Sequence, residues 1–344
     1  MITIRNLFSA VSMGLVAAFG LAGDVSALDG RNPGSLLVYP EFDNRSGIVT
    51  LLTVTNVNLD EVEGTTKVEF RYIGKYGMSG QDLGCGESNF TNTLTGGDTL
   101  TLITNFHNPS HAQGYVYVFA KRVNDITGDD EPTVHNYLTG NVMTVSGLNR
   151  FDYSVNPISY RGIGNGVTTD LDGDGHLDMN GCEYGTNPDV ILIPRFLGQG
   201  GPFQSELILI ALSGGTAFET IVDFLIYNDN EEVFSSEFRF TCWDRVRILD
   251  ISGIFHNAFL RDWTNHAAAE IVGVPGREAG WMRLQGAVAN STNTVIHDPS
   301  VYAVLVEKIG DMGASDLPFE LGSRDNGELL PRSNLGDVDD VQCN

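Results

Sequence analysis

The sequence has few basic residues. Its 20 Lys and Arg stand against 44 Asp and Glu, which gives a formal net charge of −24. A chain of this charge is repelled by nucleic-acid phosphates and by anionic lipid surfaces, so we expect neither as a partner. Beyond residue 27 it also lacks an apolar run long enough to cross a bilayer as a helix, so we expect no membrane span after processing.

The motifs of common enzyme classes are absent as well. There is no G-x-S-x-G nucleophile elbow, no H-E-x-x-H zinc motif, no P-loop and no dinucleotide fingerprint. His107 and His111 are four residues apart, but they lie in a loop-like segment, and this spacing aligns two metal ligands only on a helix. Acidic pairs such as Glu231 and Glu232 lie in turn-like contexts. We therefore assign no catalytic residue.

The first 27 residues have the features of a secretory signal peptide. Arg5 supplies the positive charge, residues 7–21 form a mostly apolar stretch, and Val25 and Ala27 occupy positions −3 and −1 of a cleavage site. A membrane anchor is the alternative interpretation of the same stretch. We expect cleavage after Ala27 and a secreted protein, extracellular or periplasmic.

Cysteine is scarce, and its spacing excludes the usual zinc sites. The four cysteines are Cys85, Cys182, Cys242 and Cys343, with no C-x-x-C pair among them. An even number in an exported chain favours two disulfides, and four cysteines allow three pairings.

Short strand-like segments fill most of the chain. They are apolar or alternating runs, rich in β-branched and aromatic residues and bounded by Gly, Asn, Asp and Pro. Only 254–264, and more weakly 265–272, could form a short helix. The strand-like segments are 36–39, 48–55, 67–73, 99–104, 115–121, 141–145, 190–193, 206–212, 220–227, 233–240, 245–250, 281–289 and 301–307. The pattern predicts an all-β protein of antiparallel sandwich architecture.

Positions in the first half recur, in order, in the second half. At an offset of 154 residues the matches are Pro40 with Pro194, Phe42 with Phe196, Val68 with Val222 and Phe70 with Phe224. At an offset of 161 they include Pro157 with Pro318, Asn165 with Asn326 and Cys182 with Cys343. We therefore expect a tandem duplication, with one large sandwich as the alternative.

This organisation divides the chain into five parts. They are a signal peptide (1–27), a β-sandwich domain (28–164), an acidic linker (165–188), a second β-sandwich domain (189–322) and an acidic C-terminal tail with Cys343 (323–344).

The linker contains the most specific motif of the sequence. Asp170, Asp172, Asp174 and Asp178 occupy positions 1, 3, 5 and 9 of a loop, and Gly175 occupies position 6. Carboxylates at this spacing, with glycine at the sharp bend, supply the oxygen ligands that Ca²⁺ prefers. A solvated acidic linker is the alternative.

Residues 170–183 resemble the calcium loops of EF-hand-like, dockerin and thrombospondin type 3 repeats. The resemblance implies that the four Asp residues are side-chain ligands and that His176 offers its backbone carbonyl. Position 12, where these families place an acidic ligand, is Gly181, and Glu183 follows two residues later as the candidate final ligand. We expect a structural Ca²⁺ that offsets repulsion among the carboxylates and fixes the linker.

If the halves are repeats, a disulfide should close each of them. Cys85 and Cys242 both precede a strand, and Cys182 and Cys343 match at the offset of 161. We therefore predict the pairs Cys85–Cys182 and Cys242–Cys343. The rival pairing, Cys85–Cys242 with Cys182–Cys343, would join the two domains to each other.

These features favour a secreted or cell-surface protein without enzymatic activity. Its expected role is binding, adhesion or structure, with an unidentified protein or glycan as partner. An extracellular hydrolase that acts on polysaccharide through carboxylates in its loops is the alternative, because sequence cannot show the distance between two carboxyl groups.

Overall fold

The computed structural model describes residues 32–60, 64–147, 151–213, 215, 219–229, 231–262, 276–288 and 298–329. The predicted signal peptide (1–27), the weak helix prediction (265–272) and Cys343 lie outside these ranges. Within them the chain is almost entirely β, as the alternating segments predict, and every pairing between named strands is antiparallel. No described helix has the length and hydropathy needed to cross a membrane.

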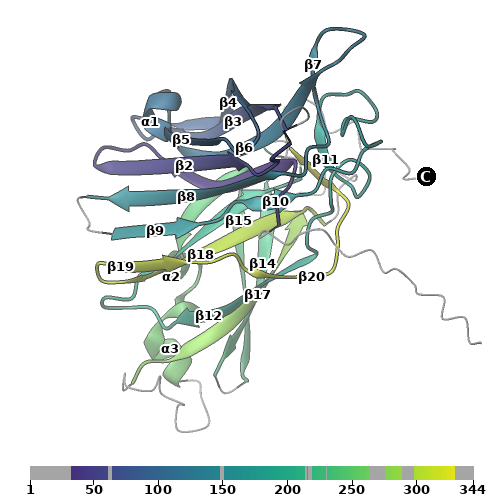
Figure 1. Ribbon diagram of the computed structural model, residues 1–344. Helices are drawn as coiled ribbons and strands as arrows, with labels where there is room; N and C mark the ends of the chain where they lie inside the picture. Colours follow the sequence, from purple (N-terminus) through teal and green to yellow (C-terminus); the bar gives the residue numbers. More distant parts are fainter. Residues whose placement is uncertain are drawn as a thin grey trace, which may run out of the picture.

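The first half of the chain forms a sandwich of two sheets (Figure 1). One, here called the β1 sheet, has the order β10 (Ile158–Tyr160), β1 (Leu36–Asp43), β6 (His111–Val123), β3 (Thr66–Gly77), β4 (Asp82–Leu94), with β7 (Asp130–Pro132) paired to β6. The other, the β2 sheet, has the order β5 (Thr99–Ile103), β2 (Ile48–Asn56), β8 (Leu138–Ser146), β9 (Phe151–Val155). The short helix α1 (Thr104–His107) connects β5 to β6.

The second half forms another sandwich. Its β12 sheet has the order β20 (Phe319–Leu321), β12 (Val190–Leu197), β17 (Ala279–Val288), β14 (Thr220–Asn228), β15 (Val233–Phe240). Its β13 sheet has the order β16 (Trp243–Arg247), β13 (Glu206–Ala211), β18 (Val301–Ile309), β19 (Met312–Ser315). The helical turns α2 (Ile248–Ile251), η1 (Gly253–Phe255) and α3 (Asn257–Asp262) follow β16.

The two sandwiches have the same strand order. Taken along the chain, β1 to β6 occupy the sheet positions of β12 to β17, and β8, β9 and β10 those of β18, β19 and β20. Even an irregularity recurs: the β1–β6 register shifts between Tyr39 and Phe42, and the β12–β17 register shifts between Ile193 and Phe196. The strands of the two halves do not mix within these four sheets.

Alternating apolar positions build the core between the sheets. The buried residues of both sandwiches form one continuous hydrophobic cluster. Most of the alternating aromatic side chains belong to it, namely Phe70, Tyr72, Tyr115, Tyr117, Phe119, Phe224 and Phe240. Period-two aromatics here serve mainly to fill the interior, as is usual for half-buried strands.

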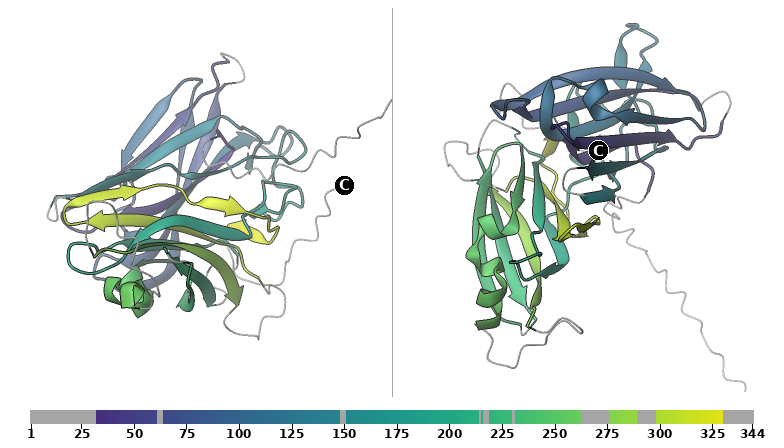
Figure 2. Two further views of the ribbon diagram at one scale, coloured as in Figure 1. Left: turned by 90° about the horizontal axis from the view of Figure 1, so that it is seen from below. Right: turned by 90° about the vertical axis from the view of Figure 1, so that its left-hand side faces the viewer.

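The first sandwich rests on the outer face of the β13 sheet, with the strands of the two sandwiches running in different directions (Figure 2). Trp243, on β16, is fully buried, and its indole N–H donates to the carbonyl oxygen of Pro40 at 2.8 Å. Strands β9 and β19 lie side by side at this contact (Figure 1).

The predicted pairing of the cysteines is wrong. Cys85, on β4, is bonded to Cys242, in the tight connection between β15 and β16, so neither Cys85–Cys182 nor Cys242–Cys343 forms. The disulfide joins the two sandwiches instead of closing each half. The reason is tertiary: the β3–β4 hairpin of the first sandwich packs against the β15–β16 corner of the second, which brings the two Cα atoms to 6.5 Å.

The segment between the sandwiches is tied to the end of the described chain. Its strand β11 (Leu177–Met179) pairs with β21 (Gly327–Leu329) in a separate two-stranded sheet. Leu177, Met179 and Leu329 are buried in the common core. The candidate calcium loop therefore leads directly into a strand that is fixed by hydrogen bonds and burial.

Candidate metal centre

The loop before β11 brings three predicted ligands together. One carboxylate oxygen from each of Asp170, Asp172 and Asp174 can be chosen so that all three lie within 4.8 Å of one another. Asx-type hydrogen bonds hold this curvature: the Gly173 N–H donates to Asp170 Oδ1 at 2.8 Å, and the Asp174 N–H donates to Asp172 Oδ1 at 3.1 Å. Gly175 has a φ of 80°, the left-handed conformation that glycine adopts without strain.

Glu183 is a fourth acidic residue beside this loop, although its carboxyl group is not one of the three that cluster within 4.8 Å. Its side chain is fully buried, and Oε1 accepts a hydrogen bond from the Leu171 N–H within the loop. Its other oxygen, Oε2, is buried and has no hydrogen-bond partner among the described residues. Burial, reinforced by the negative charges of Asp172 and Asp170, raises the pKa of Glu183 to about 8. The ionised form of such a buried group is costly unless a cation is present, and the raised pKa keeps it protonated at neutral pH in the absence of one.

Within the described part of the chain, lysine and arginine do not compensate the charge around the loop. None of the described Lys or Arg residues forms an ion pair with Asp170, Asp172, Asp174 or Glu183. Partial burial and the neighbouring Asp172 and Asp174 raise the pKa of Asp170, although the Gly173 N–H works in the opposite direction. Hard oxygen donors gathered in this way are suited to a hard divalent cation.

The side chains of the two remaining residues of the predicted ligand set, Asp178 and His176, do not belong to the cluster of three carboxylates. Asp178 is buried on β11, opposite Glu328 in the β11–β21 register, and is not one of the three clustered carboxylates. The side chain of His176 lies between acidic groups, with Nδ1 2.9 Å from Asp174 Oδ2 and 3.0 Å from Glu328 Oε1. Glu328 is a neighbour that sequence reasoning missed, because nothing near it in the chain signals contact with a loop so far upstream.

A rigid frame surrounds the loop. The backbone N–H groups of Ile163 and Gly164 donate to the carbonyls of Glu183 and Cys182, each at 2.8 Å. The Thr169 hydroxyl donates to the hydroxyl of the buried Tyr184 at 2.7 Å. These hydrogen bonds fix both ends of residues 170–183. They therefore restrict the backbone that carries the carboxylates.

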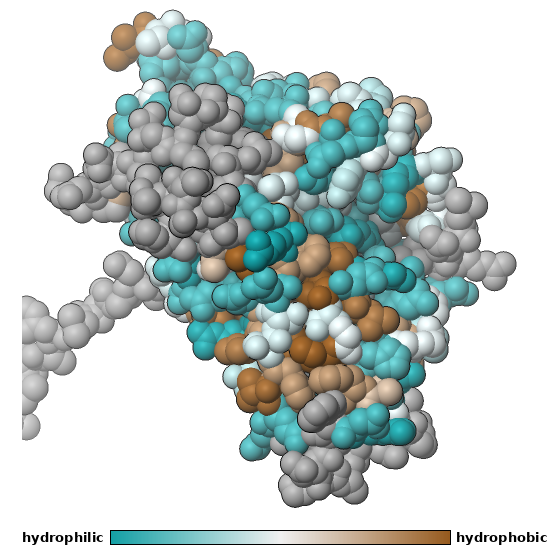
Figure 3. All heavy atoms as spheres, turned by 180° about the vertical axis from the view of Figure 1, so that it is seen from behind, coloured by the Kyte–Doolittle hydropathy of each residue, from teal (hydrophilic) through white to brown (hydrophobic). Residues whose placement is uncertain are grey.

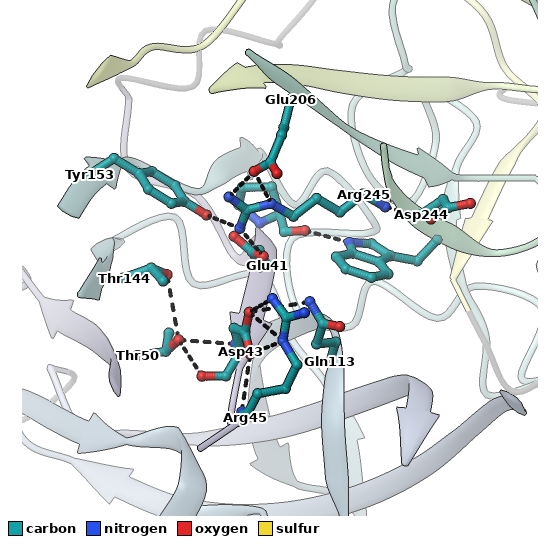
Figure 4. Close-up of polar contacts among 12 residues, drawn as sticks. Glu41, Asp43, Arg45, Thr50, Gln113, Thr144, Tyr153, Glu206, Asp244 and Arg245 are labelled. Atoms are coloured by element: carbon teal, nitrogen blue, oxygen red, sulfur yellow. Dashed lines mark hydrogen bonds and ion pairs between the residues drawn. The ribbon is translucent and has the colours of Figure 1, made fainter. Parts of the chain in front are cut away.

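A second polar cluster lies at the contact between the sandwiches (Figure 4). The Arg245 guanidinium pairs with Glu41 from β1 and with Glu206 from β13, the latter at 2.6 Å, and donates to the Tyr153 hydroxyl at 3.2 Å. Burial raises the pKa of Glu41 to about 7, while Arg245 lowers it. This cluster links β1, β9, β13 and β16, and we interpret it as a structural contact.

The two histidines of the sequence analysis have separate structural contacts. His107, on α1, has Nδ1 2.9 Å from the Tyr72 hydroxyl and packs against Phe70 and Phe90. His111 has Nδ1 3.2 Å from the Asn108 side-chain nitrogen. Burial lowers the pKa of both rings, which favours neutral histidines that serve as hydrogen-bonding core residues.

No family model matches the chain, and no curated protein matches it.

Proposed function

We propose that this is an exported, non-enzymatic β protein with a binding or structural role, in which a calcium ion orders the connection between the two sandwiches. The observation that carries the calcium site is the orphaned oxygen of buried Glu183, next to the cluster of Asp170, Asp172 and Asp174. The acidic loop alone would be a common feature of a solvated turn. A fully buried carboxyl group beside it, with no cationic partner and a pKa raised to about 8, stays protonated at neutral pH without a cation, and a bound divalent ion would stabilise its ionised form.

Calcium fits this donor set better than magnesium. It accepts six to eight oxygen ligands in flexible geometry at about 2.3–2.6 Å, whereas Mg²⁺ needs near-octahedral geometry and retains several waters. Four side-chain carboxylates would provide part of the shell, namely Asp170, Asp172, Asp174 and Glu183. The resemblance to known calcium loops adds the carbonyl of His176 and assigns a ligand role to Asp178, whose carboxyl group is not one of the three that cluster.

The role of the ion follows from what the loop joins. It begins where the first sandwich ends, and its strand β11 pairs with β21 after the last strand of the second sandwich. A cation that fixes the loop therefore stabilises a region in contact with both halves. Because metal binding to the native state alone adds to folding free energy, the ion should raise the stability of the whole chain.

Two further parts of the proposal concern origin and location. The shared strand order and the repeated register shift support a tandem duplication. The disulfide between Cys85 and Cys242 supports folding in an oxidising compartment, in agreement with export directed by the first 27 residues.

Thermal unfolding with and without calcium tests the metal site. Calcium at a hundredfold excess over its Kd should stabilise the native chain by about 2.7 kcal/mol, observed as a higher melting temperature than in chelator. The double variant Asp172→Ala with Asp174→Ala should lose this shift. The matched control, Asp125→Ala with Asp129→Ala, removes two exposed acids from the β6–β7 turn and should keep it. An identical melting curve for the native chain in calcium and in chelator would refute the site.

A further inference from the structure

The contact between the two sandwiches uses a different surface of each. The second sandwich contributes the outer face of its β13 sheet, from which Trp243 and Arg245 reach Pro40 and Glu41. The first contributes the register shift in β1, strand β9 and the end of its β3–β4 hairpin, where Lys75 donates to Thr241 at 2.9 Å. We call this second surface the docking edge of the first sandwich.

Because the strand order repeats, the second sandwich has its own docking edge. Pro194 and Arg195 lie at the β12 register shift, as Pro40 and Glu41 lie at that of β1, and β19 takes the place of β9. Strand β19 already lies beside β9 within the chain, but at the β12 register shift no described side chain fills the edge in the way that Arg245 fills the first. A hollow of about 540 Å³ remains there, and among the residues that line it are Ile193, Arg195, Leu305, Leu317 and Phe319.

Exposed apolar side chains surround the hollow. Met312 on β19 is 70% exposed, and Phe319 and Leu321 on β20 are 63% and 53% exposed. The outer face of the β12 sheet continues the surface with Trp281, which stacks on Tyr227 at a ring distance of 4.0 Å. Figure 3, which views the molecule from behind, shows further hydrophobic side chains over the second sandwich, on the side away from β19 and β20 in Figure 1. Apolar surface of this kind on a soluble domain is typical of a contact site.

The partner surface recurs in the same way. The counterpart of the β13 sheet is the β2 sheet, whose outer face no described segment covers. Its strands β5, β2 and β8 contain no Asp, Glu, Lys, Arg or His, although 19% of the chain is charged. The exposed face presents Val49 and Ile103 together with rows of threonine, such as Thr53 and Thr101, whose hydroxyls are 3.1 Å apart.

We propose that the docking edge of the second sandwich binds the outer face of the β2 sheet of a second copy of this chain. The contact within the chain is the basis for this choice of partner. There the docking edge of the first sandwich binds the outer face of the β13 sheet, and the β2 sheet is the counterpart of the β13 sheet. Only β9 adds a charge to the described strands of this sheet, the exposed Asp152, so contact at β5, β2 and β8 avoids much of the repulsion that two chains of net charge −24 otherwise experience.

The two surfaces of this contact are different, so the interface is heterologous. Each terminal copy keeps one open hollow at its docking edge and one uncovered outer face of its β2 sheet, and assembly continues head to tail instead of stopping at a dimer. This inference goes beyond the proposed calcium role and does not depend on it.

Sedimentation equilibrium of the calcium-loaded full chain tests the proposal. The average mass of the native chain should rise steadily with concentration, beyond that of two chains. Phe319→Glu blocks the docking edge and Thr101→Glu blocks the β2 face, because Thr101 holds on β5 the place that Arg245 holds on β16. Each variant alone should remain at the mass of one chain. Ile126→Glu and Thr127→Glu, at exposed positions of the β6–β7 turn, are the matched controls and should assemble like the native chain.

Mixing the two blocked variants gives the sharper result. Each retains the surface that the other has lost, so an equimolar mixture should form one-to-one dimers and nothing larger. A native chain that stays at the mass of one chain overturns the proposal. So does a Thr101→Glu variant that still dimerises alone, because that outcome means that the exposed face of the second sandwich pairs with itself.

Discussion

At the scale of single residues, the contact between the sandwiches depends on one buried arginine. Arg245 is 12% exposed and has carboxylates from both sandwiches around it, Glu41 and Glu206. Removing one partner of such a group leaves an uncompensated charge, which typically costs several kcal/mol. Two acids share a single guanidinium here, and the more buried of them, Glu41, has a pKa raised to about 7 from an ordinary value of 4.5.

This raised pKa predicts a pH dependence of stability. Below pH 4.5 Glu41 is protonated in both the folded and the unfolded chain. Between pH 4.5 and 7 it ionises in the unfolded chain but stays protonated in the folded chain, which favours unfolding as the pH rises. Stability should therefore fall between these two values, by at most about 3 kcal/mol at 1.36 kcal/mol per pKa unit.

Urea unfolding across this pH range measures the effect. The Glu41→Gln variant should lack this part of the decrease, whereas Glu237→Gln, an exposed acid on β15, should follow the native curve. Parallel curves for the native chain and Glu41→Gln would mean that Glu41 ionises normally.

At the scale of elements, both sandwiches depend on a close approach of two strands next to their register shift. Gly114 on β6 and Gly280 on β17 lie opposite Phe42 and Phe196. A Cβ at Gly114 would be 1.9 Å from the Ile73 carbonyl oxygen, and one at Gly280 would be 2.3 Å from the Tyr227 carbonyl oxygen. Only glycine permits these strands to pair at the normal distance.

Alanine substitution tests this constraint in both halves. Gly114→Ala and Gly280→Ala should each destabilise the chain by roughly 1–3 kcal/mol, the usual cost of inserting a methyl group into close-packed structure. Gly253→Ala is the control, because a Cβ there meets no atom within 4 Å. Chemical denaturation gives the three values, and a loss confined to one of the two repeats would show that the corresponding positions differ in packing.

Alternating apolar segments in the sequence predicted the central strands of the sheets. They did not predict strands whose conformation depends on pairing with a neighbouring strand. The predicted segment 48–55 is β2 (Ile48–Asn56), and 220–227 lies within β14 (Thr220–Asn228). Strand β4 was missed because its residues are mostly Gly, Ser, Asn and Thr, and its conformation comes from pairing with β3. The range 254–264, where we expected a short helix, contains the observed helix α3 (Asn257–Asp262).

The candidate site was predictable only in its local part. Spacing alone brought Asp170, Asp172 and Asp174 together, because a short loop with glycine at its bends curves these side chains to one point. The contact of His176 with Glu328, like the bond between Cys85 and Cys242, depends on how two sandwiches pack. Sequence patterns within one element carry no information of that kind.

At the scale of the whole molecule, several connections make the two halves one unit. The disulfide joins β4 to the β15–β16 corner, Arg245 bridges the sandwiches, and β11 pairs with β21 beyond the second sandwich. The acidic loop lies in the segment of the chain between the two sandwiches and leads directly into β11. Its carboxylates oppose folding through mutual repulsion, so a bound cation would act on a region that both halves share.

Calorimetric titration of calcium into the chelator-treated full chain tests this account most directly. We expect one saturable calcium site per chain. Asp172→Ala with Asp174→Ala should abolish it, and Glu183→Gln, which keeps the shape of the side chain but removes its charge, should weaken it strongly. Glu237→Gln, an exposed acid elsewhere, should leave it unchanged. A native chain that takes up no calcium, or binds it equally well without Asp172, Asp174 and the charge of Glu183, would contradict the account.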